Sequence, residues 1–167
     1  MKKQYINNKE FKSLVANICR DIANSNWRPD YVVGITRGGL PAATMISHYF
    51  DVPMHALKVS LRHGIDDSES NLWMSEDAFG FEQTKNILIV DDINDSGRTI
   101  EWIMEDWRAS CMPRDPKWNT VWNNTTRFAV VVDNLNSNAP VKMDYCGKEI
   151  DKQSDDWIVF PYENWWE

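Results

Sequence analysis

Apolar and polar positions alternate along the first quarter of the chain with the period of a helix. Between Phe11 and Ile22 apolar residues recur at spacings of three and four, which is typical of a helix with one buried face. Asn7 or Asn8 stands where a side chain can accept a hydrogen bond from the first turn. The pattern therefore predicts a capped amphipathic helix near the start of the chain.

Two further segments have the helical period. Residues 40–50 form the first, and Pro41 is tolerated there because it falls in the first turn. The second runs from Ser96, the expected capping residue, to about Ser110, and its apolar face carries Ile100, Ile103, Met104 and Trp107.

Short apolar runs lie between these helices and predict β-strands at residues 31–35, 53–61, 86–90 and 127–133. The last run is uninterrupted, which favours a strand buried on both faces. A hairpin-like edge is expected around Gly147, within residues 141–150, and one more short strand near residue 157. Strands that alternate with helices predict an α/β domain with a central, mainly parallel sheet flanked by helices.

Two stretches show no sustained period. Arg62 to Gln83 predicts a long loop or flap, and residues 111–126 are irregular and rich in Pro, Asn and Trp. No linker or internal repeat separates the parts, so residues 1–167 are expected to form a single domain.

Composition narrows the function classes. The net charge of -7 and the pI near 5.0 exclude the usual basic surface for nucleic acid. Cys19, Cys111 and Cys146 lack CxxC spacing, which favours reduced thiols over a disulfide frame or a zinc site. No apolar stretch is long enough for a signal peptide or a membrane span, so a cytoplasmic location without membrane contact is expected.

The stretch NILIVDDINDSGRTI carries the most informative chemistry. Asp91 and Asp92 follow a buried strand, Asp95 comes three residues later, and Ser96 and Gly97 open the next helix. Backbone N–H groups and the helix dipole at such a start favour a phosphate. Carboxylates repel a phosphate but suit sugar hydroxyls or Mg²⁺ nearby. Together these groups describe a site for a ribose 5-phosphate.

Three other interpretations compete. A calcium loop beginning at Asp92 places Gly97 correctly at the sixth position, but Ile103 replaces the glutamate required at the twelfth. A phosphate-binding loop of the Walker A type needs a lysine after its glycine, and none is present. Acids at strand ends are often simply solvated turn residues, but three acids, a glycine and two hydroxyls within nine residues are unusual for that reading.

The segment ILIVDDINDSGRT resembles the phosphoribosyl-pyrophosphate motif of type I phosphoribosyltransferases, with Asn94 where the family usually has an aliphatic residue. The resemblance implies that Asp91 and Asp92 hold the ribose hydroxyls and Mg²⁺, and that Asp95 accepts a proton from the base. It implies a 5-phosphate site made by the turn from Asp95 to Thr99, namely Asp95, Ser96, Gly97, Arg98 and Thr99.

A second segment, VVGITRGGLPAA, is similar to the pyrophosphate loop of the same family. The similarity implies that Thr36, Arg37, Gly38 and Gly39 bind pyrophosphate, with a cis peptide bond between Thr36 and Arg37. Taken alone, the segment is equally consistent with a glycine turn between a strand and a helix.

The rest of the chain extends the resemblance, which is strongest for xanthine- and hypoxanthine-guanine-type enzymes. Residues 62–83 stand where the family has a flexible hood, and residues 112–126 look like an insertion. DDWIVFPYENWW is similar to the C-terminal base-binding segment, which places Trp157 and Ile158 against the base. Trp157 as a plain core residue is the alternative. Asp133 or Asn134 replaces the usual purine-contacting lysine, and Asn134 is expected to donate to the base.

The implied function is a purine phosphoribosyltransferase of nucleotide salvage, a glycosyltransferase that uses phosphoribosyl pyrophosphate, a nucleobase and Mg²⁺. A homodimer or higher homo-oligomer is expected by analogy with the family. The alternative is a non-catalytic regulator of the same fold that binds the sugar donor or a nucleotide.

Overall fold

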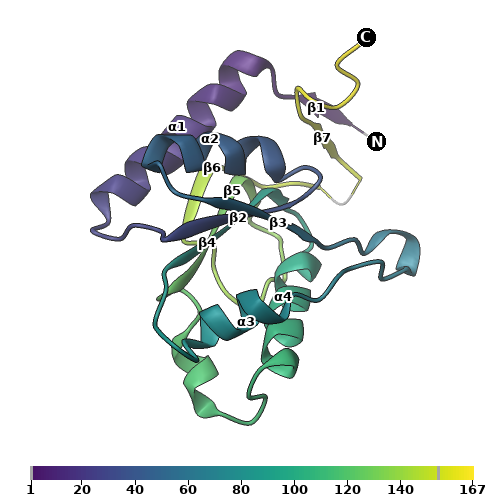
Figure 1. Cartoon of the computed structure of the whole chain (residues 1–167). Helices are drawn as coiled ribbons and strands as arrows, with labels where there is room; N and C mark the ends of the chain where they lie inside the picture. The colour runs from purple at the N-terminus through teal and green to yellow at the C-terminus, as the bar shows by residue number, and fades with distance from the viewer. Residues whose placement is uncertain (1, 154) are drawn as a thin grey trace.

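The computed structural model describes residues 2–153 and 155–167, and its centre is a parallel five-stranded sheet (Figure 1). The strand order is β3-β2-β4-β5-β6, and every neighbouring pair is parallel. The five strands are β2 (Tyr31–Thr36), β3 (Met54–Lys58), β4 (Ile87–Asn94), β5 (Thr126–Asn134) and β6 (Tyr145–Ile150).

Helices cover both faces of this sheet, as Figure 1 shows. Helices α1 (Asn8–Asn24) and α2 (Leu40–Phe50) pack on one face, and α3 (Leu72–Phe79) and α4 (Arg98–Ser110) on the other. A separate parallel pair, β1 (Lys3–Tyr5) and β7 (Trp157–Val159), brings the two ends of the chain together. The predicted flanked parallel sheet is confirmed.

Helix α1 shows how directly the apolar period determines this packing. Its buried residues are the ones that the spacing selects, from Phe11 to Ile22, and all belong to the core on that face of the sheet. The cap is Asn7, whose side-chain oxygen accepts a hydrogen bond from the Glu10 N–H at 2.8 Å.

Two elements differ from the sequence predictions. Leu72–Phe79, expected within a loop, is helix α3, whose Met74 is fully buried; a single short helix carries too few turns for a clear period. The segment around Gly147 is not a hairpin. It is β6, parallel to β5, and a Cβ at Gly147 would lie 2.6 Å from the Val131 carbonyl oxygen.

The irregular stretch after α4 is ordered by its tryptophans. It contains a short 3₁₀ helix, η2 (Pro116–Thr120), and a second one, η1 (Arg62–Gly64), lies in the predicted hood. Trp118 is buried, stacks on Trp122 with ring centres 5.7 Å apart, and donates to the Cys111 carbonyl. The stretch is therefore part of the core on the α4 face.

Strand β4 is longer than predicted and continues past its neighbour. It pairs with β2 only as far as Val90, but with β5 as far as Asn94. Residues 91–94 therefore have no strand on the β2 side, which opens a crevice at the carboxyl ends of the central strands. Among the described residues, no helix is long and apolar enough to cross a membrane.

Candidate active site

The crevice beside β4 is the mouth of a cavity of about 880 Å³. It brings together most of the predicted site residues, which come from three separate segments: Thr36, Arg37, Gly38, Asp91, Asp92, Asp95, Ser96, Gly97, Arg98, Thr99, Trp157 and Ile158. Two predicted site residues, Gly39 and Asn134, are not part of its lining. Five cationic side chains line the cavity beside four acidic ones, although the whole chain has a net charge of -7.

The loop after β2 has the predicted cis peptide bond between Thr36 and Arg37. Gly39 donates its N–H to the Ile35 carbonyl at 2.8 Å, and a Cβ there would lie 2.5 Å from the Val90 carbonyl oxygen. This N–H is therefore used inside the protein and is not directed at an anion in the cavity. Gly39 is needed because α2 starts in contact with β4.

Asp91 and Asp92 are neighbours on the extension of β4, where both are partly buried. The Asp91 carboxylate accepts the Asp92 N–H at 2.9 Å, and the Asp92 carboxylate accepts the Ile93 N–H at 2.8 Å. Burial raises the pKa of both carboxyl groups, and the charge of Asp92 raises that of Asp91 further, to well above its usual range. A cation between them would offset this cost.

The turn from β4 to α4 has the geometry of an anion site. Gly97 caps the helix at φ 90°, in the left-handed region, and a Cβ there would lie 2.2 Å from the Ala139 nitrogen. Ser96, the predicted cap, stands one residue earlier, and its hydroxyl accepts the Arg98 N–H at 3.3 Å. The start of α4 faces the cavity, so the helix dipole favours an anion there.

Asp95 is held by two side chains, one of them a lysine that the sequence did not indicate. The Nζ of Lys152 lies 3.0 Å from Asp95 Oδ2, and Asn134 donates from Nδ2 to Asp95 Oδ1 at 3.2 Å. The Oδ1 of Asn134 accepts the Lys152 N–H at 3.2 Å. Asn134 thus supports Asp95 and Lys152 from behind, and this arrangement does not favour the predicted contact between Asn134 and a base.

Asp133, which the sequence placed near a base, is turned to another partner. Its carboxylate accepts a hydrogen bond from the Asn94 amide at 2.9 Å, and Asn94 in turn accepts from the Ser137 hydroxyl at 2.9 Å. The polar residue at position 94 therefore ties β4 to β5 and to the loop that covers Gly97. Asp133 is not part of the cavity lining.

The C-terminal segment closes one side of the cavity. Trp157 is 47% exposed and Ile158 is buried, and both line the cavity as predicted. The exposure of Trp157 argues against a plain core role. Tyr162 was not singled out by the sequence, and its hydroxyl lies 2.9 Å from the Gly38 carbonyl and 3.1 Å from Asp92 Oδ2.

The predicted hood is reduced to a short excursion between β3 and α3. Asp66 accepts a hydrogen bond from the Trp102 ring nitrogen at 2.9 Å, which holds the excursion against α4. Lys58 lines the cavity and pairs with Asp67 at 3.0 Å. A phosphate entering the cavity would compete with Asp67 for this lysine.

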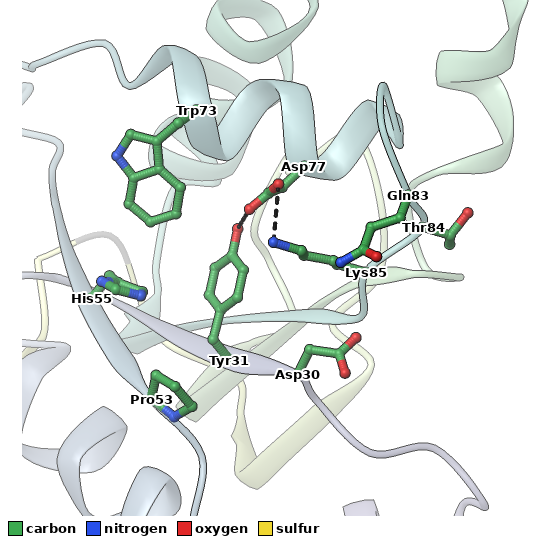
Figure 2. Close-up of a pocket in the computed structure, with 9 residues that line it drawn as sticks. All are labelled: Asp30, Tyr31, Pro53, His55, Trp73, Asp77, Gln83, Thr84 and Lys85. Atoms are coloured by element: carbon green, nitrogen blue, oxygen red, sulfur yellow. Dashed lines mark hydrogen bonds and ion pairs between the residues drawn. The ribbon is translucent and has the colours of Figure 1, made fainter.

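A second cavity, of about 710 Å³, lies at the opposite end of the sheet (Figure 2). Asp77 on α3 accepts from the Tyr31 hydroxyl at 3.0 Å and pairs with Lys85 at 3.4 Å. The rings of Tyr31, His55 and Trp73 pack against one another with centres 4.9 to 5.9 Å apart. The charged groups of Asp77 and Lys85 are therefore paired with each other at this end of the sheet.

Asp91 and Asp92 are the candidate ligands for a metal ion in the cavity. The described residues contain no cluster of three or more His, Cys, Asp or Glu that could hold one. Mg²⁺, however, is commonly bound through one or two carboxylates, with water and substrate phosphates as the other ligands. Asp91 and Asp92 fit this mode, because both face the cavity and both have raised pKa values.

A glycine loop, a helix start and a carboxylate pair thus line one cavity at the carboxyl ends of a parallel sheet. The chain belongs to the phosphoribosyl transferase domain family, whose model matches residues 1–164. The family identification from the sequence motifs is therefore confirmed.

Two curated relatives and one solved structure are distant in sequence but align with nearly the whole chain. Xanthine phosphoribosyltransferase 1 of Saccharomyces cerevisiae is 23% identical over 96% of this chain and 90% of its own. Bifunctional protein pyrR of Enterococcus faecalis is 26% identical, with 97% and 90% covered. The solved purine phosphoribosyltransferase of Pyrococcus horikoshii has a TM-score of 0.68 at 23% identity, with 98% and 95% covered, and confirms the fold.

Two side chains of this site were missed by the sequence reasoning, Lys152 and Tyr162. Their partners are 57 and 70 residues away along the chain, so no local pattern marks them. One signal was usable. Because no lysine directly follows β5, a cation from another segment could be expected beside Asp95.

Proposed function

We propose that this chain transfers the ribose 5-phosphate group of phosphoribosyl pyrophosphate to a 6-oxopurine and releases pyrophosphate. The observation that carries the proposal is the convergence of residues 36–38 and 91–99 on one cavity of about 880 Å³. Membership of the phosphoribosyl transferase domain family and the similarity to purine enzymes support it.

The sugar donor fits the cavity in one direction. Its 5-phosphate would lie at the start of α4, where the Ser96 hydroxyl and the backbone of the turn meet the helix dipole. Its pyrophosphate would lie against Arg37 and Gly38, and its ribose hydroxyls against Asp91 and Asp92. This places opposite charges together at both ends of the donor.

The reaction needs electrostatic support more than covalent chemistry. As pyrophosphate leaves, the anomeric carbon gains positive charge, and the carboxylates of Asp91 and Asp92 stabilise it from the ribose side. Mg²⁺, when bound by these two carboxylates, supplies charge neutralisation for the departing pyrophosphate. Arg37 holds the leaving group, and the hood segment excludes water that would otherwise hydrolyse the donor.

The pair of Asp95 and Lys152 supports an oxopurine as the acceptor. A carboxylate and an ammonium 3.0 Å apart match a base edge that presents an N–H next to a carbonyl oxygen, as a 6-oxopurine does. Asp95 would accept the proton of the ring nitrogen, and Lys152 would donate to the oxo group. A 6-aminopurine would place an amino donor against the ammonium. Trp157 lines the same cavity and would offer its ring for stacking.

A panel of acceptors tests the proposal. Pyrophosphate release is measured with the donor, Mg²⁺ and each of xanthine, guanine, hypoxanthine, adenine, uracil and orotate. We expect turnover with one or more of the three oxopurines and little with adenine. Turnover with uracil or orotate alone would overturn the choice of base but leave the transfer reaction standing.

A second candidate is a non-catalytic regulator that binds the donor or a nucleotide. Its support is the similarity to bifunctional protein pyrR, which covers 97% of the chain. The same panel separates the two, because a regulator would bind the donor and show no turnover with any of the six bases.

A further inference from the structure

We infer that Tyr162 is a positioning residue that holds the pyrophosphate loop against Asp92. Its hydroxyl would thereby fix the loop that binds pyrophosphate relative to the carboxylate that binds the ribose. The inference rests on the proposed use of phosphoribosyl pyrophosphate. The C-terminal segment would then orient the pyrophosphate loop, in addition to binding the base.

One hydroxyl joins three segments that are far apart in the sequence. The Tyr162 hydroxyl lies 2.9 Å from the carbonyl oxygen of Gly38 and 3.1 Å from Oδ2 of Asp92. Gly38 belongs to the loop after β2, Asp92 to the extension of β4, and Tyr162 to the segment after β7. Both partners are acceptors, so the single hydroxyl proton lies between a carbonyl and a carboxylate.

These two acceptors are forced close to each other by the backbone. A Cβ added at Gly38 would lie only 2.1 Å from Oδ2 of Asp92, so the loop runs directly against the carboxylate. Without a donor between them, two oxygen acceptors would face each other in a partly buried place, which is unfavourable. Tyr162 supplies that donor. A tyrosine hydroxyl is protonated at neutral pH, so it can donate to either acceptor.

The ring of Tyr162 fixes where the hydroxyl stands. It is stacked on Phe160 with ring centres 5.6 Å apart and an interplanar angle of 5°, and it meets the edge of Phe11 at 5.7 Å. Phe11 is buried on α1, and Phe160 is buried next to β7. The hydroxyl is therefore held by rigid packing, which is what a positioning group requires.

The consequence concerns one part of the donor only. Removing the hydroxyl frees the loop from Asp92, so the pyrophosphate loses its support, whereas the Asp92 carboxylate is still held by the Ile93 N–H for the ribose hydroxyls. The 5-phosphate turn is held by other groups, because Gly97 packs under Ala139, and Lys152 and Asn134 hold Asp95. Affinity for a ligand with a 5-phosphate but no pyrophosphate should not change.

The test compares two ligands and two variants by calorimetry with Mg²⁺ present. Tyr162→Phe removes one oxygen and keeps the stacked ring. Tyr31→Phe is the matched control, because the Tyr31 hydroxyl also donates to an aspartate, Asp77, but at the other end of the sheet. For Y162F we expect the Kd of phosphoribosyl pyrophosphate to rise about tenfold, the usual loss for one hydrogen bond to a charged group.

For Y162F the Kd of ribose 5-phosphate should stay within about twofold of wild type, as should both ligands for Y31F. With enzyme turnover as the second readout, the KM for the donor should rise while the KM for the base changes little. Equal losses for the two ligands, or unchanged donor affinity, would overturn the inference and leave the proposed function intact. A wild-type protein that binds no donor would overturn both.

Discussion

The two cavities of this molecule contain the same kinds of side chain but arrange them differently. Each has a tyrosine hydroxyl on an aspartate, a lysine on an aspartate and a tryptophan that is about half exposed. In the cavity at the start of the strands, Tyr31 and Lys85 both bind Asp77 (Figure 2). In the cavity at the strand ends, the partners are spread over Asp92 and Asp95.

This difference follows from the direction of the parallel strands. At their carboxyl ends, the loop after β2 lines the cavity, and the turn after β4 leads into α4, whose first turn faces the cavity with a favourable helix dipole. At the amino ends, the charged side chains of Asp77 and Lys85 pair with each other. Lys152 and Asp95 are also paired in the cavity at the strand ends, so charged residues indicate a ligand site there only together with the helix start and the glycine loop that line the same cavity.

Asp91 and Asp92 should give the largest contrast between the cavities. Changing both to asparagine, D91N with D92N, removes the charge that stabilises the ribose cation, and turnover should fall about a thousandfold or more. Asp77→Asn is the same chemical change in the other cavity and should leave turnover within about twofold. Pyrophosphate release measures both, and circular dichroism checks folding. Comparable losses in the two variants would contradict the assignment of the site.

Lys152 and Lys85 offer the second contrast. Lys152→Met leaves Asp95 without its cation and removes the donor to the oxo group, so kcat/KM for the oxopurines should fall about a hundredfold. Lys85→Met should have little effect. The ratio of kcat/KM values for oxopurines and adenine separates two roles for Lys152. If kcat/KM falls equally for all bases, Lys152 acts only on Asp95 and does not bind the oxo group of the base.

Trp157 and Trp73 are 47% and 46% exposed, which makes them a matched pair. Trp157→Ala should raise the KM for the base about tenfold, because stacking of a base on an aromatic ring is lost. The KM for the sugar donor should change little, and Trp73→Ala should change neither. Steady-state kinetics with both substrates varied gives the four values. An unchanged KM for the base would contradict stacking and would leave Trp157 with a structural role only.

The smallest effect concerns pH and the stability of the ligand-free protein. Because the pKa values of Asp91 and Asp92 are raised on folding, the native state holds protons that the unfolded state has lost. Stability should therefore fall as pH rises from the ordinary carboxyl pKa towards the raised values. Asp91→Asn should flatten this slope and raise the melting temperature at pH 7 by a few degrees. Thermal scans from pH 4 to pH 8 measure it, with D77N as the variant that keeps the slope.

The parts of the fold that the sequence predicts well are those with a local signal. The buried face of α1 follows from spacing alone, and the glycine turns after β2 and β4 follow from residue type and position. Helix α3 was missed, because its eight residues show little separation of apolar and polar faces. The parallel pairing of β6 was missed, because strand direction depends on a partner far away in the sequence.

The site residues, like the elements of the fold, were predicted where the signal is local and missed where it depends on distant segments. The residues that would hold the sugar donor lie in two short motifs, and the structure places nearly all of them on one cavity. The residues around the acceptor depend on contacts between distant segments. Asn134 has a polar side chain at the expected position, but its amide is occupied by Asp95, and Lys152 reaches that carboxylate from beyond β6. No local sequence pattern indicates that Asn134 supports Asp95 or that Lys152 is the cation beside it.

The most direct test of the account is a calorimetric titration of phosphoribosyl pyrophosphate, with Mg²⁺, into the folded wild-type protein, the D91N/D92N variant and D77N. We predict one binding site per chain in the wild type and in D77N, and no measurable binding to D91N/D92N. Absence of heat with the wild type, or equal affinity for all three proteins, would contradict the claim that the cavity at the strand ends holds the sugar donor.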